Sequence, residues 1–294
     1  MTKDNIRKTA GYCFHILFTV TLLCVLGVMM ESATPSYAAG QTFKGKNNWL
    51  FYKAQGDGST MYDYRGINHY SSSGLRRAAN NLLAAEKRVN QKGAEFVVYF
   101  APNKETIYSQ YMPDRIRRVT TYTRYDQLYD YLTLNTGLNI AYPKDELLAQ
   151  RDNYELYYPN DTHWNPKGQF IGVQELMDIT DGKKISIEDV RFKTINHYNG
   201  DLNHLSYGQY HYNCKNYRLV GKMRAEDKSK LKVFIVGDSF GHRMANMAKK
   251  FYKKATFSHI NNFRMSMVDG YDVVVWETVE RYQDRFAWVN LANR

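Results

Sequence analysis

Two short stretches carry residue types that can perform acyl chemistry together. The segment "VFIVGDSFG", residues 233–241, leaves an apolar run through a turn of small residues that presents Ser239. In "NDTHW", Asp161 and His163 are two residues apart, so in an extended loop they project from the same side of the backbone. A carboxylate can then orient the imidazole, and the imidazole can take a proton from a serine hydroxyl. The sequence therefore predicts a triad in the chain order Asp161, His163, Ser239.

The stretch "GDSFG" also fits the pattern G-x-S-x-G of the α/β-hydrolase nucleophile elbow, but chain order argues against that fold. The fold needs its acid and then its histidine after the serine, and only His242 and His259 follow Ser239. The alternative is the GDS turn of SGNH hydrolases, in which backbone N–H groups at a helix start stabilise an oxyanion. Amides near Ser239 and Gly241 are the expected donors. The simplest alternative is a serine that only caps a helix.

The elements that must position these residues alternate between strand and helix. Short apolar runs such as "EFVVYFAP" at 95–102 predict strands buried on both faces. The stretch "NPKG" predicts a helix with Asn165 as N-cap and Pro166 at its first position. We also expect a short strand or hairpin with loops within 41–70 and an irregular covering layer at 183–230. Further helices are expected at 73–90, 124–134, 144–151 and after Ser239, and further strands at 138–141, 232–236, 256–259 and 271–277. This alternation predicts an α/β fold whose mostly parallel sheet is covered on both faces.

Three further residues follow the ends of predicted strands, where open α/β sheets bind ligands. Asn103 and Lys104 come directly after the strand at 95–101, and Arg264 lies between the last two strands. Asn103 and Lys104 are candidates for substrate contact or for support of the oxyanion, and Arg264 for substrate contact. A polar turn and an ordinary surface arginine are the competing interpretations.

Neither a metal nor another cofactor is expected. His211 and Cys214 have no second pair of ligands at metal-binding spacing. Asp201 in "NGDL" is interpreted as a residue that caps a turn. The predicted chemistry therefore depends on protein side chains alone.

The N-terminus has the composition of an export signal. Three basic residues within the first eight positions precede an uncharged apolar run at 11–30, and "SYA" at 36–38 has the small-x-small pattern of a cleavage site. The run is also close to the length of a membrane span. We expect residues 1–38 to be a signal peptide or a membrane anchor, and residues 39–294 to be an exported domain.

Charge and cysteine content narrow the possible partners of this exported domain. The chain has a formal net charge of +11. Outside the membrane, such a charge favours anionic envelope polymers and lipid headgroups over nucleic acid. Only Cys214 lies beyond the apolar run, so no disulfide can form within the domain.

Several motifs occur together in one order along residues 41–285, namely "GKNNWLFY", "APNKETIYSQYMP", "NDTHW", "NGDLNHL" and "VGDSF". In this order the sequence resembles the SGNH-hydrolase-like family of AlgX and AlgJ, the alginate O-acetyltransferase proteins, and the related DHHW proteins. The resemblance implies a three-layer fold with a central, mostly parallel sheet. It also implies that Ser239 is the nucleophile, His163 the general base and Asp161 its orienting acid. Thr162 stands where the DHHW spelling has a histidine.

The resemblance implies an O-acetyltransferase that acts on hydroxyls of an extracellular or cell-envelope polysaccharide through an acyl-serine. The expected partners are the polysaccharide acceptor and a membrane-bound O-acyltransferase that supplies acetyl groups. A carbohydrate esterase with the same triad is the first alternative, because water and a sugar hydroxyl attack the same intermediate. The second is a non-catalytic protein that binds glycans through a basic, tyrosine-rich surface.

Overall fold

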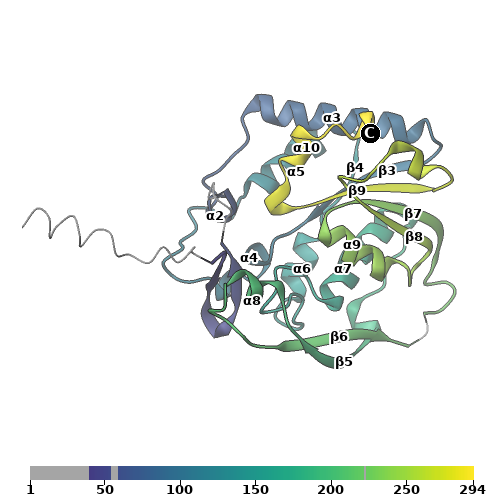
Figure 1. Cartoon of the computed structure of the whole chain (residues 1–294). Coiled ribbons are helices and arrows are strands. Elements are labelled where there is room, and N and C mark those ends of the chain that lie inside the picture. Colours follow the sequence, from purple (N-terminus) through teal and green to yellow (C-terminus); the bar gives the residue numbers. More distant parts are fainter. Residues whose placement is uncertain (1–39, 54–58, 222) are drawn as a thin grey trace, which may run out of the picture. The chain divides into compact units, whose positions relative to one another are not determined.

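A five-stranded parallel sheet forms the centre of the fold. The computed structural model describes residues 40–53, 59–221 and 223–294. The strands lie in the order β4, β3, β9, β7, β8, and every neighbouring pair is parallel (Figure 1). Their bounds are β3 (Glu95–Ala101), β4 (Asn139–Ala141), β7 (Ser229–Gly237), β8 (Tyr252–His259) and β9 (Val273–Val279). The predicted parallel sheet is confirmed.

The register of the central strands brings distant segments to one edge of the sheet. Ala101 at the end of β3 pairs with Val279 at the end of β9, and Val236 of β7 pairs with Trp276 of β9. Nearly all of β3 and β9 is buried, and β7 is buried from Val233 onward, because both faces of the sheet are covered there. The segments that follow β3, β7 and β9 therefore begin close together at the carboxyl edge, where open parallel sheets bind ligands.

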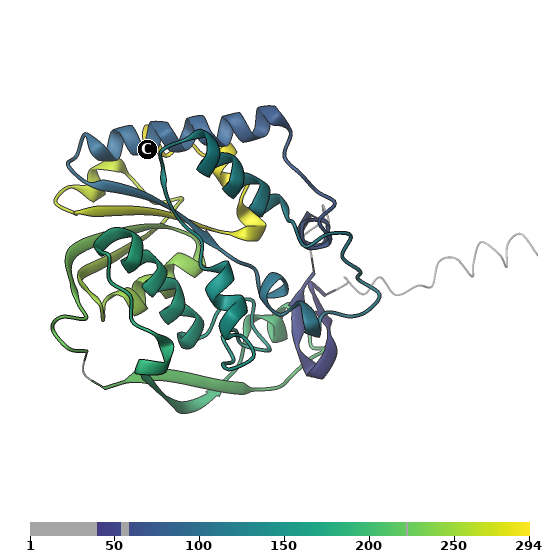
Figure 2. The same cartoon turned by 180° about the vertical axis from the view of Figure 1, so that it is seen from behind.

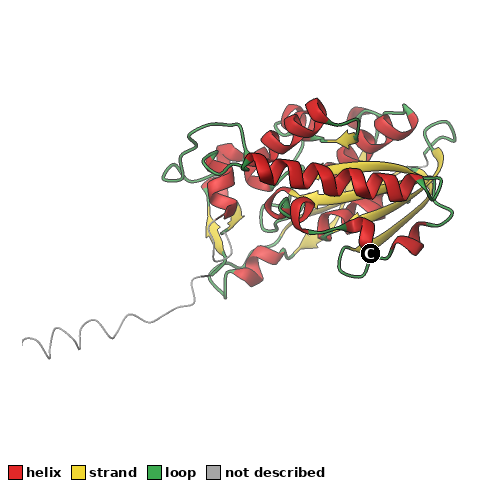
Figure 3. Ribbon diagram, turned by 90° about the horizontal axis from the view of Figure 1, so that it is seen from above, coloured by secondary structure: helices red, strands yellow, loops and turns green. Residues whose placement is uncertain are grey.

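One face of the sheet is covered by α3 (Ser72–Asn90), α5 (Arg124–Asn135) and α10 (Arg285–Trp288). Figure 3 looks onto this layer and shows α3 lying in front of the strands. Ser71 caps the N-terminus of α3, because its side chain accepts a hydrogen bond from the Gly74 N–H. The helix packs an apolar stripe against the sheet, consisting of Leu75, Ala78, Ala79, Leu82, Ala85 and Val89.

The opposite face is covered by α7 (Pro166–Asp181) and α9 (Ser239–Ala248), with α4 (Lys104–Ile107) and α6 (Lys144–Gln150) beside them (Figure 2). The α7 helix begins as predicted, because the Asn165 side chain accepts from the N–H groups of Lys167 and Gly168. The expected three layers, helices on both faces of a sheet, are present in the described residues.

Smaller elements flank these layers. The predicted N-terminal hairpin consists of β1 (Thr42–Lys44) and β2 (Leu50–Tyr52), and α2 (Ser59–Arg65) follows it.

The expectation of an irregular layer at 183–230 is wrong in part. That segment contains an antiparallel pair, β5 (Arg191–Tyr198) and β6 (Cys214–Val220), with α8 (Asp201–Leu205) between them. Both strands are largely polar and only partly buried, so their sequences lack the apolar alternation that predicts a strand.

The residues from Gly40 to Arg294 form one compact unit. Within the described part of this unit, no helix has the length and apolar character needed to cross a bilayer. The predicted signal peptide or anchor at 1–38 lies outside the described residues.

Candidate active site

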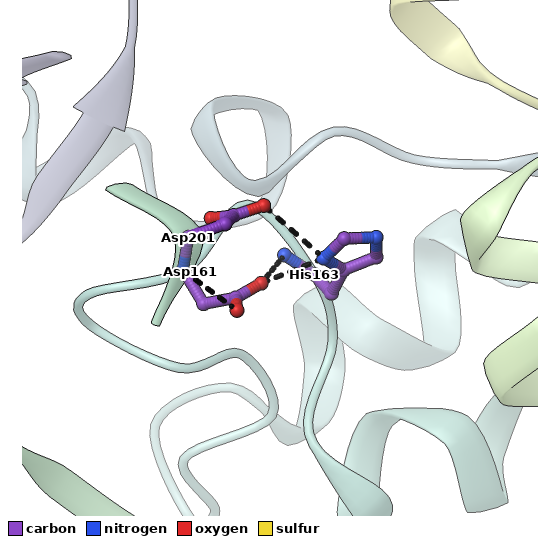
Figure 4. Close-up of side chains that lie close together, drawn as sticks. All are labelled: Asp161, His163 and Asp201. Carbon is purple, nitrogen blue, oxygen red and sulfur yellow. Dashed lines mark hydrogen bonds and ion pairs between the residues drawn. The ribbon is translucent and has the colours of Figure 1, made fainter. Parts of the chain in front are cut away.

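The structure brings the three residues of the predicted triad together. His163 Nε2 lies 2.7 Å from Ser239 Oγ, and His163 Nδ1 lies 2.7 Å from Asp161 Oδ1. Figure 4 shows Asp161 and His163 on the same loop. The Nδ1 side of the imidazole faces the Asp161 carboxylate, and the Nε2 side points away from it. The hydroxyl comes from the other side of the site, at the start of α9. The arrangement is a hydrogen-bonded chain from carboxylate to imidazole to hydroxyl.

Ser239 is exposed, although the residues on either side of it are buried. It is the first residue of α9 and directly follows the turn after β7. Asp238, not Ser239, caps the helix, because its carboxylate accepts from the Phe240 N–H at 3.0 Å. The interpretation of Ser239 as a capping residue is therefore wrong, and its hydroxyl faces His163 and solvent.

Asp161 is buried and its two oxygens are fully engaged. Oδ1 accepts from the His163 backbone N–H at 2.8 Å as well as facing the imidazole, and Oδ2 accepts from Tyr198 Oη at 2.8 Å and the Asp201 N–H at 3.1 Å. Burial alone would raise the pKa of Asp161, but hydrogen bonds and charge from His163 and the nearby Arg243 guanidinium hold that pKa well below its usual range. The group is therefore an ionised carboxylate, the state that orients and stabilises an imidazolium.

Asp201 is a second carboxylate at the imidazole, and sequence reasoning missed its position. Its oxygens accept from the Thr162 N–H at 2.7 Å and from Thr162 Oγ1 at 2.6 Å, and Oδ2 lies 3.5 Å from His163 Nδ1 (Figure 4). Burial would raise the pKa of Asp201, but hydrogen bonding from His163 and Thr162 lowers it. The residue interpreted as a turn cap therefore fixes the turn between Asp161 and His163.

Asp161, His163 and Asp201 are also the residue types that hold metal ions, and one atom of each lies within 4.8 Å of the others. All four carboxylate oxygens, however, already accept hydrogen bonds from protein groups. A cation would have to displace several of these donors. The cluster fits an oriented imidazole better than a metal centre.

The turn that carries Ser239 is held by a buried carboxyl group on β9. Glu277 Oε2 accepts from the N–H groups of Asp238 at 3.1 Å and Gly241 at 2.9 Å. A Cβ atom at Gly237 or Gly241 would lie 2.3 or 2.6 Å from that oxygen, so both positions require glycine. The pKa of Glu277 is raised well above its ordinary value, mainly by burial and to a smaller extent by the negative charge of Asp238.

This contact corrects one predicted role. Gly241 was expected to offer its N–H to the oxyanion, but that N–H is buried and donates to Glu277. The N–H of Ser239 lies in the first turn of α9, where no carbonyl of the same helix is available to it.

Asn103 lies at the same edge of the sheet, within a second network formed by the two residues that directly follow β9. Its N–H donates to Glu280 Oε2 at 2.9 Å, and its side-chain oxygen accepts from Arg281 Nη1 at 3.0 Å. The Arg281 guanidinium lies 5.2 Å from the ring centroid of Phe240, and the His163 ring centroid is 4.8 Å from that of Phe240. Arg281 is thus a neighbour of the triad that no sequence motif indicated.

Lys104 is enclosed by the protein, whereas Arg264 lies between β8 and β9, as the sequence predicts. The Lys104 side chain is only 1% exposed, and its ammonium donates to three backbone carbonyls of residues 158–161, so it does not face a substrate. Arg264 is exposed and donates to the neighbouring Phe263 carbonyl at 2.7 Å. Within the described residues it makes no bond to the triad. The predicted role of Lys104 in substrate contact or oxyanion support is therefore wrong. Substrate contact by Arg264 stays a prediction.

Comparison with known proteins supports the resemblance seen in the motifs. The family model described as ALGX, SGNH hydrolase-like domain, acetyltransferase AlgX, matches residues 43–266. Comparison with curated protein sequences gives no match. Among solved structures, the O-acetyltransferase domain of Pseudomonas putida AlgJ is 16% identical with a TM-score of 0.55, and the match covers 83% of this chain and 92% of that one.

Two further structures have the same fold. AlgX of Pseudomonas aeruginosa is 15% identical with a TM-score of 0.58, over 87% of this chain but only 66% of AlgX, just under two thirds of its length. A DHHW family protein from Eubacterium siraeum is 14% identical with a TM-score of 0.56, over 85% of this chain and 98% of that one. At these identities the likeness extends to the fold, and the resemblance predicted from the motifs is confirmed.

Proposed function

The chain belongs to the SGNH hydrolase-like family of the acetyltransferase AlgX, and on that premise we propose that it is an O-acetyltransferase of an extracellular or cell-envelope polysaccharide. The observation that carries the proposal is the 2.7 Å separation between His163 Nε2 and Ser239 Oγ, with Asp161 at the other imidazole nitrogen. The named activity of the AlgJ domain, O-acetyl transfer, supports the same reaction class.

In the first half-reaction, Ser239 Oγ attacks the carbonyl carbon of an acetyl donor while His163 Nε2 takes the hydroxyl proton. Asp161 keeps the Nδ1 proton facing itself, so that Nε2 is the free base, and stabilises the imidazolium that forms. His163 then gives the proton to the leaving group. The products are an acetyl ester on Ser239 and the free donor alcohol or thiol.

In the second half-reaction, a sugar hydroxyl attacks the acetyl-serine. His163 Nε2 now takes the proton of that sugar hydroxyl and returns it to Ser239 Oγ as the ester moves to the sugar. Water in place of the sugar would give acetate, which is the reaction of a carbohydrate esterase. The two functions differ in which hydroxyl reaches the intermediate first.

Negative charge develops on the carbonyl oxygen in both half-reactions. We assign its stabilisation to the Ser239 N–H at the start of α9, with the Asn103 side-chain amide as the second donor. The Asn103 oxygen is already bound to Arg281, which leaves the amide nitrogen as the group that can donate. Gly241 has no part in this assignment, because its N–H is bound to Glu277.

The acceptor, donor and location follow from the same proposal. An exposed serine suits a long polymer that cannot enter a closed pocket, and the net charge of +11 favours an envelope polymer as partner. The donor side would involve a membrane-bound O-acyltransferase that delivers acetyl groups outward. The domain would work on the outer side of the membrane after export through residues 1–38.

Incubation of the full chain with an activated acetyl ester and an oligosaccharide acceptor tests the reaction class. Acetylated sugar, lost in Ser239→Ala, is the expected result. Free acetate in the presence of abundant acceptor would favour the esterase. A protein that binds the glycan but consumes no ester, with Ser239→Ala unchanged in every respect, would be the non-catalytic alternative.

A further inference from the structure

A lysine lies completely inside the protein next to the loop that carries the triad. Lys104 is the first residue of α4, and its side chain is 1% exposed. Its ammonium donates to the carbonyl oxygens of Tyr158 at 3.2 Å, Pro159 at 3.2 Å and Asp161 at 2.7 Å. An ammonium has three N–H donors, and these three carbonyls use all of them. Lys104 makes no ion pair in the part of the chain that the structure describes, so hydrogen bonds to carbonyls must offset its burial.

The three carbonyls belong to the turn that leads directly into the triad. Asp161 holds the Lys104 ammonium through its backbone oxygen and the His163 imidazole through its carboxylate. Within the turn, the Tyr158 N–H donates to the His163 carbonyl at 3.3 Å and the Asp161 N–H to the Tyr158 carbonyl at 3.4 Å, and a bridge joins Tyr157 and Trp164 at its ends. Side chains outside the turn complete its hydrogen bonds, among them Lys104 at its carbonyls and Asp201 at the Thr162 N–H.

The N-terminal hairpin encloses the same lysine from the other side. The ammonium lies 5.6 Å from the ring centroid of Trp49 and 5.2 Å from that of Phe51. The backbone N–H of Leu50 donates to the Pro159 oxygen at 2.8 Å, the same oxygen that accepts from Lys104. The hairpin and α4 thus hold the turn at a shared atom, and contact with two aromatic faces further stabilises the cation.

We propose that Lys104 is a positioning residue of the triad, whose ammonium gathers three carbonyls of residues 158–161 and thereby sets the distance and angle at which Asp161 meets His163. This inference rests on the proposed function, because it concerns the geometry of the same site. Lys104 touches neither substrate nor reacting atoms. It acts through the backbone of Asp161.

The charge state of Lys104 gives the role a distinct pH signature. Burial lowers the pKa of Lys104 to about 8, although nearby carboxyl groups and a thiol act in the opposite direction. These groups are Asp161 in the turn, Asp201 in α8, Glu105 in α4 and Cys214 in β6. A neutral amine has two N–H donors and cannot hold three carbonyls, so the activity should decline as the pH rises through about 8.

The test compares Lys104→Met with Lys144→Met in the full chain. Lys144 is a matched control, because it is also the first residue of a helix and pairs with Asp126 at 2.5 Å, outside this turn. With an activated acetyl ester, we expect kcat of Lys104→Met to fall about 100-fold with KM nearly unchanged, since a displacement near 1 Å has that effect. Its residual rate should lose the decline above pH 8. Lys144→Met should keep the wild-type kcat at equal folded fraction.

Two results would overturn the proposal. One is a Lys104→Met protein with the wild-type kcat, and the other is an equal fall in kcat in both variants. Should Lys104→Met not fold, Lys104→Arg replaces it in the test. The variant keeps the positive charge, but a planar guanidinium cannot replace the single nitrogen on which three carbonyls converge. An Arg variant with wild-type kcat would count against Lys104 in the same way. Failure of wild-type Ser239 to become acylated would instead refute the proposed function itself.

Discussion

The Oε2 atom of Glu277 lies 2.9 Å from the backbone nitrogen of Gly241 and holds the turn from which Ser239 projects. The same oxygen accepts from the Asp238 N–H, so both sides of the serine are fixed to the end of β9. Both glycines of "GDSFG" are required, because a Cβ atom at either position would collide with this oxygen. The turn that resembles a nucleophile elbow is therefore shaped by a buried carboxyl group from another strand.

Replacing Gly241 by alanine tests this contact. The added Cβ would lie 2.6 Å from Glu277 Oε2, so the turn or the carboxylate must move. We expect a loss of about 1–3 kcal/mol in the free energy of unfolding and a 10- to 100-fold fall in kcat, roughly the effect of displacing a reacting group by 1 Å. Gly137→Ala is the control, because nothing lies within 4 Å of its Cβ. Equal behaviour of the two variants in thermal unfolding and ester turnover would refute this account of the turn.

Asp161→Asn should leave the fold intact and remove most of the activity. The amide cannot stabilise an imidazolium and favours the wrong tautomer of His163, so we expect kcat to fall by about 10³–10⁴-fold. Turnover of an activated acetyl ester measures the loss. Asp152→Asn, at a side chain that is 79% exposed, should have the wild-type rate. A fall of less than tenfold at Asp161 would argue that the carboxylate has no catalytic part.

Asp201→Asn should have a smaller effect on the same rate. The amide retains one acceptor for Thr162 but loses the charge that lies 3.5 Å from His163 Nδ1. We expect kcat to fall about 10- to 100-fold with KM unchanged, because the change weakens support for the imidazolium and not substrate binding. If Asp201 only capped a turn, the variant would lose thermal stability and keep its rate per folded molecule.

The buried Glu280 predicts a pH dependence of stability. Burial raises its pKa from 4.5 to about 7, although hydrogen bonds from Thr106 and Asn103 act in the opposite direction. Between these values the folded protein retains a proton that the unfolded chain releases, so the free energy of unfolding falls as the pH rises from about 4.5 to about 7. The contribution of this one group is at most roughly 3 kcal/mol.

Glu280→Gln should reduce that decline, because an amide is neutral at every pH in the window. The measurement is urea unfolding at pH 5 and at pH 8 for the wild type and the variant. Glu226→Gln, at a side chain that is 67% exposed, is the control. Parallel curves for wild type and Glu280→Gln would contradict the assignment.

Much of the fold could be predicted from the sequence because its periodicity is local. The strands at 95–101 and 273–279, and the helix that starts at Asn165, follow from apolar runs and cap residues only a few positions apart. The proximity of Asp161, His163 and Ser239 could be inferred from chemistry. The Asp–His pair of "NDTHW" can act as a base only beside a hydroxyl, and the serine of "GDSFG" can act as a nucleophile only beside a base. The strand order could not be read, since periodicity does not say that β9 inserts between β3 and β7.

The insertion of β9 explains the residues that were missed. Glu277 and Glu280 bond to groups that lie 36–39 and 174–177 positions away, and Arg281 reaches Asn103 across 178. A glutamate within "VVVWE" was a signal, because a charged side chain in a strand buried on both faces needs a specific partner. The identity of that partner depended on the strand order. Because the strand order was unknown, the bond from the Gly241 N–H to Glu277 could not be foreseen either.

The central claim is that Ser239 carries the acetyl group. The most direct measurement treats the full chain with an activated acetyl ester, quenches it before deacylation and locates the adduct by peptide mass. The account predicts one modified residue, Ser239, with no adduct in Ser239→Ala and a strongly slowed reaction in Asp161→Asn. A folded protein that is unmodified at Ser239, or that is acylated equally well when Ser239 is replaced by alanine, would contradict it.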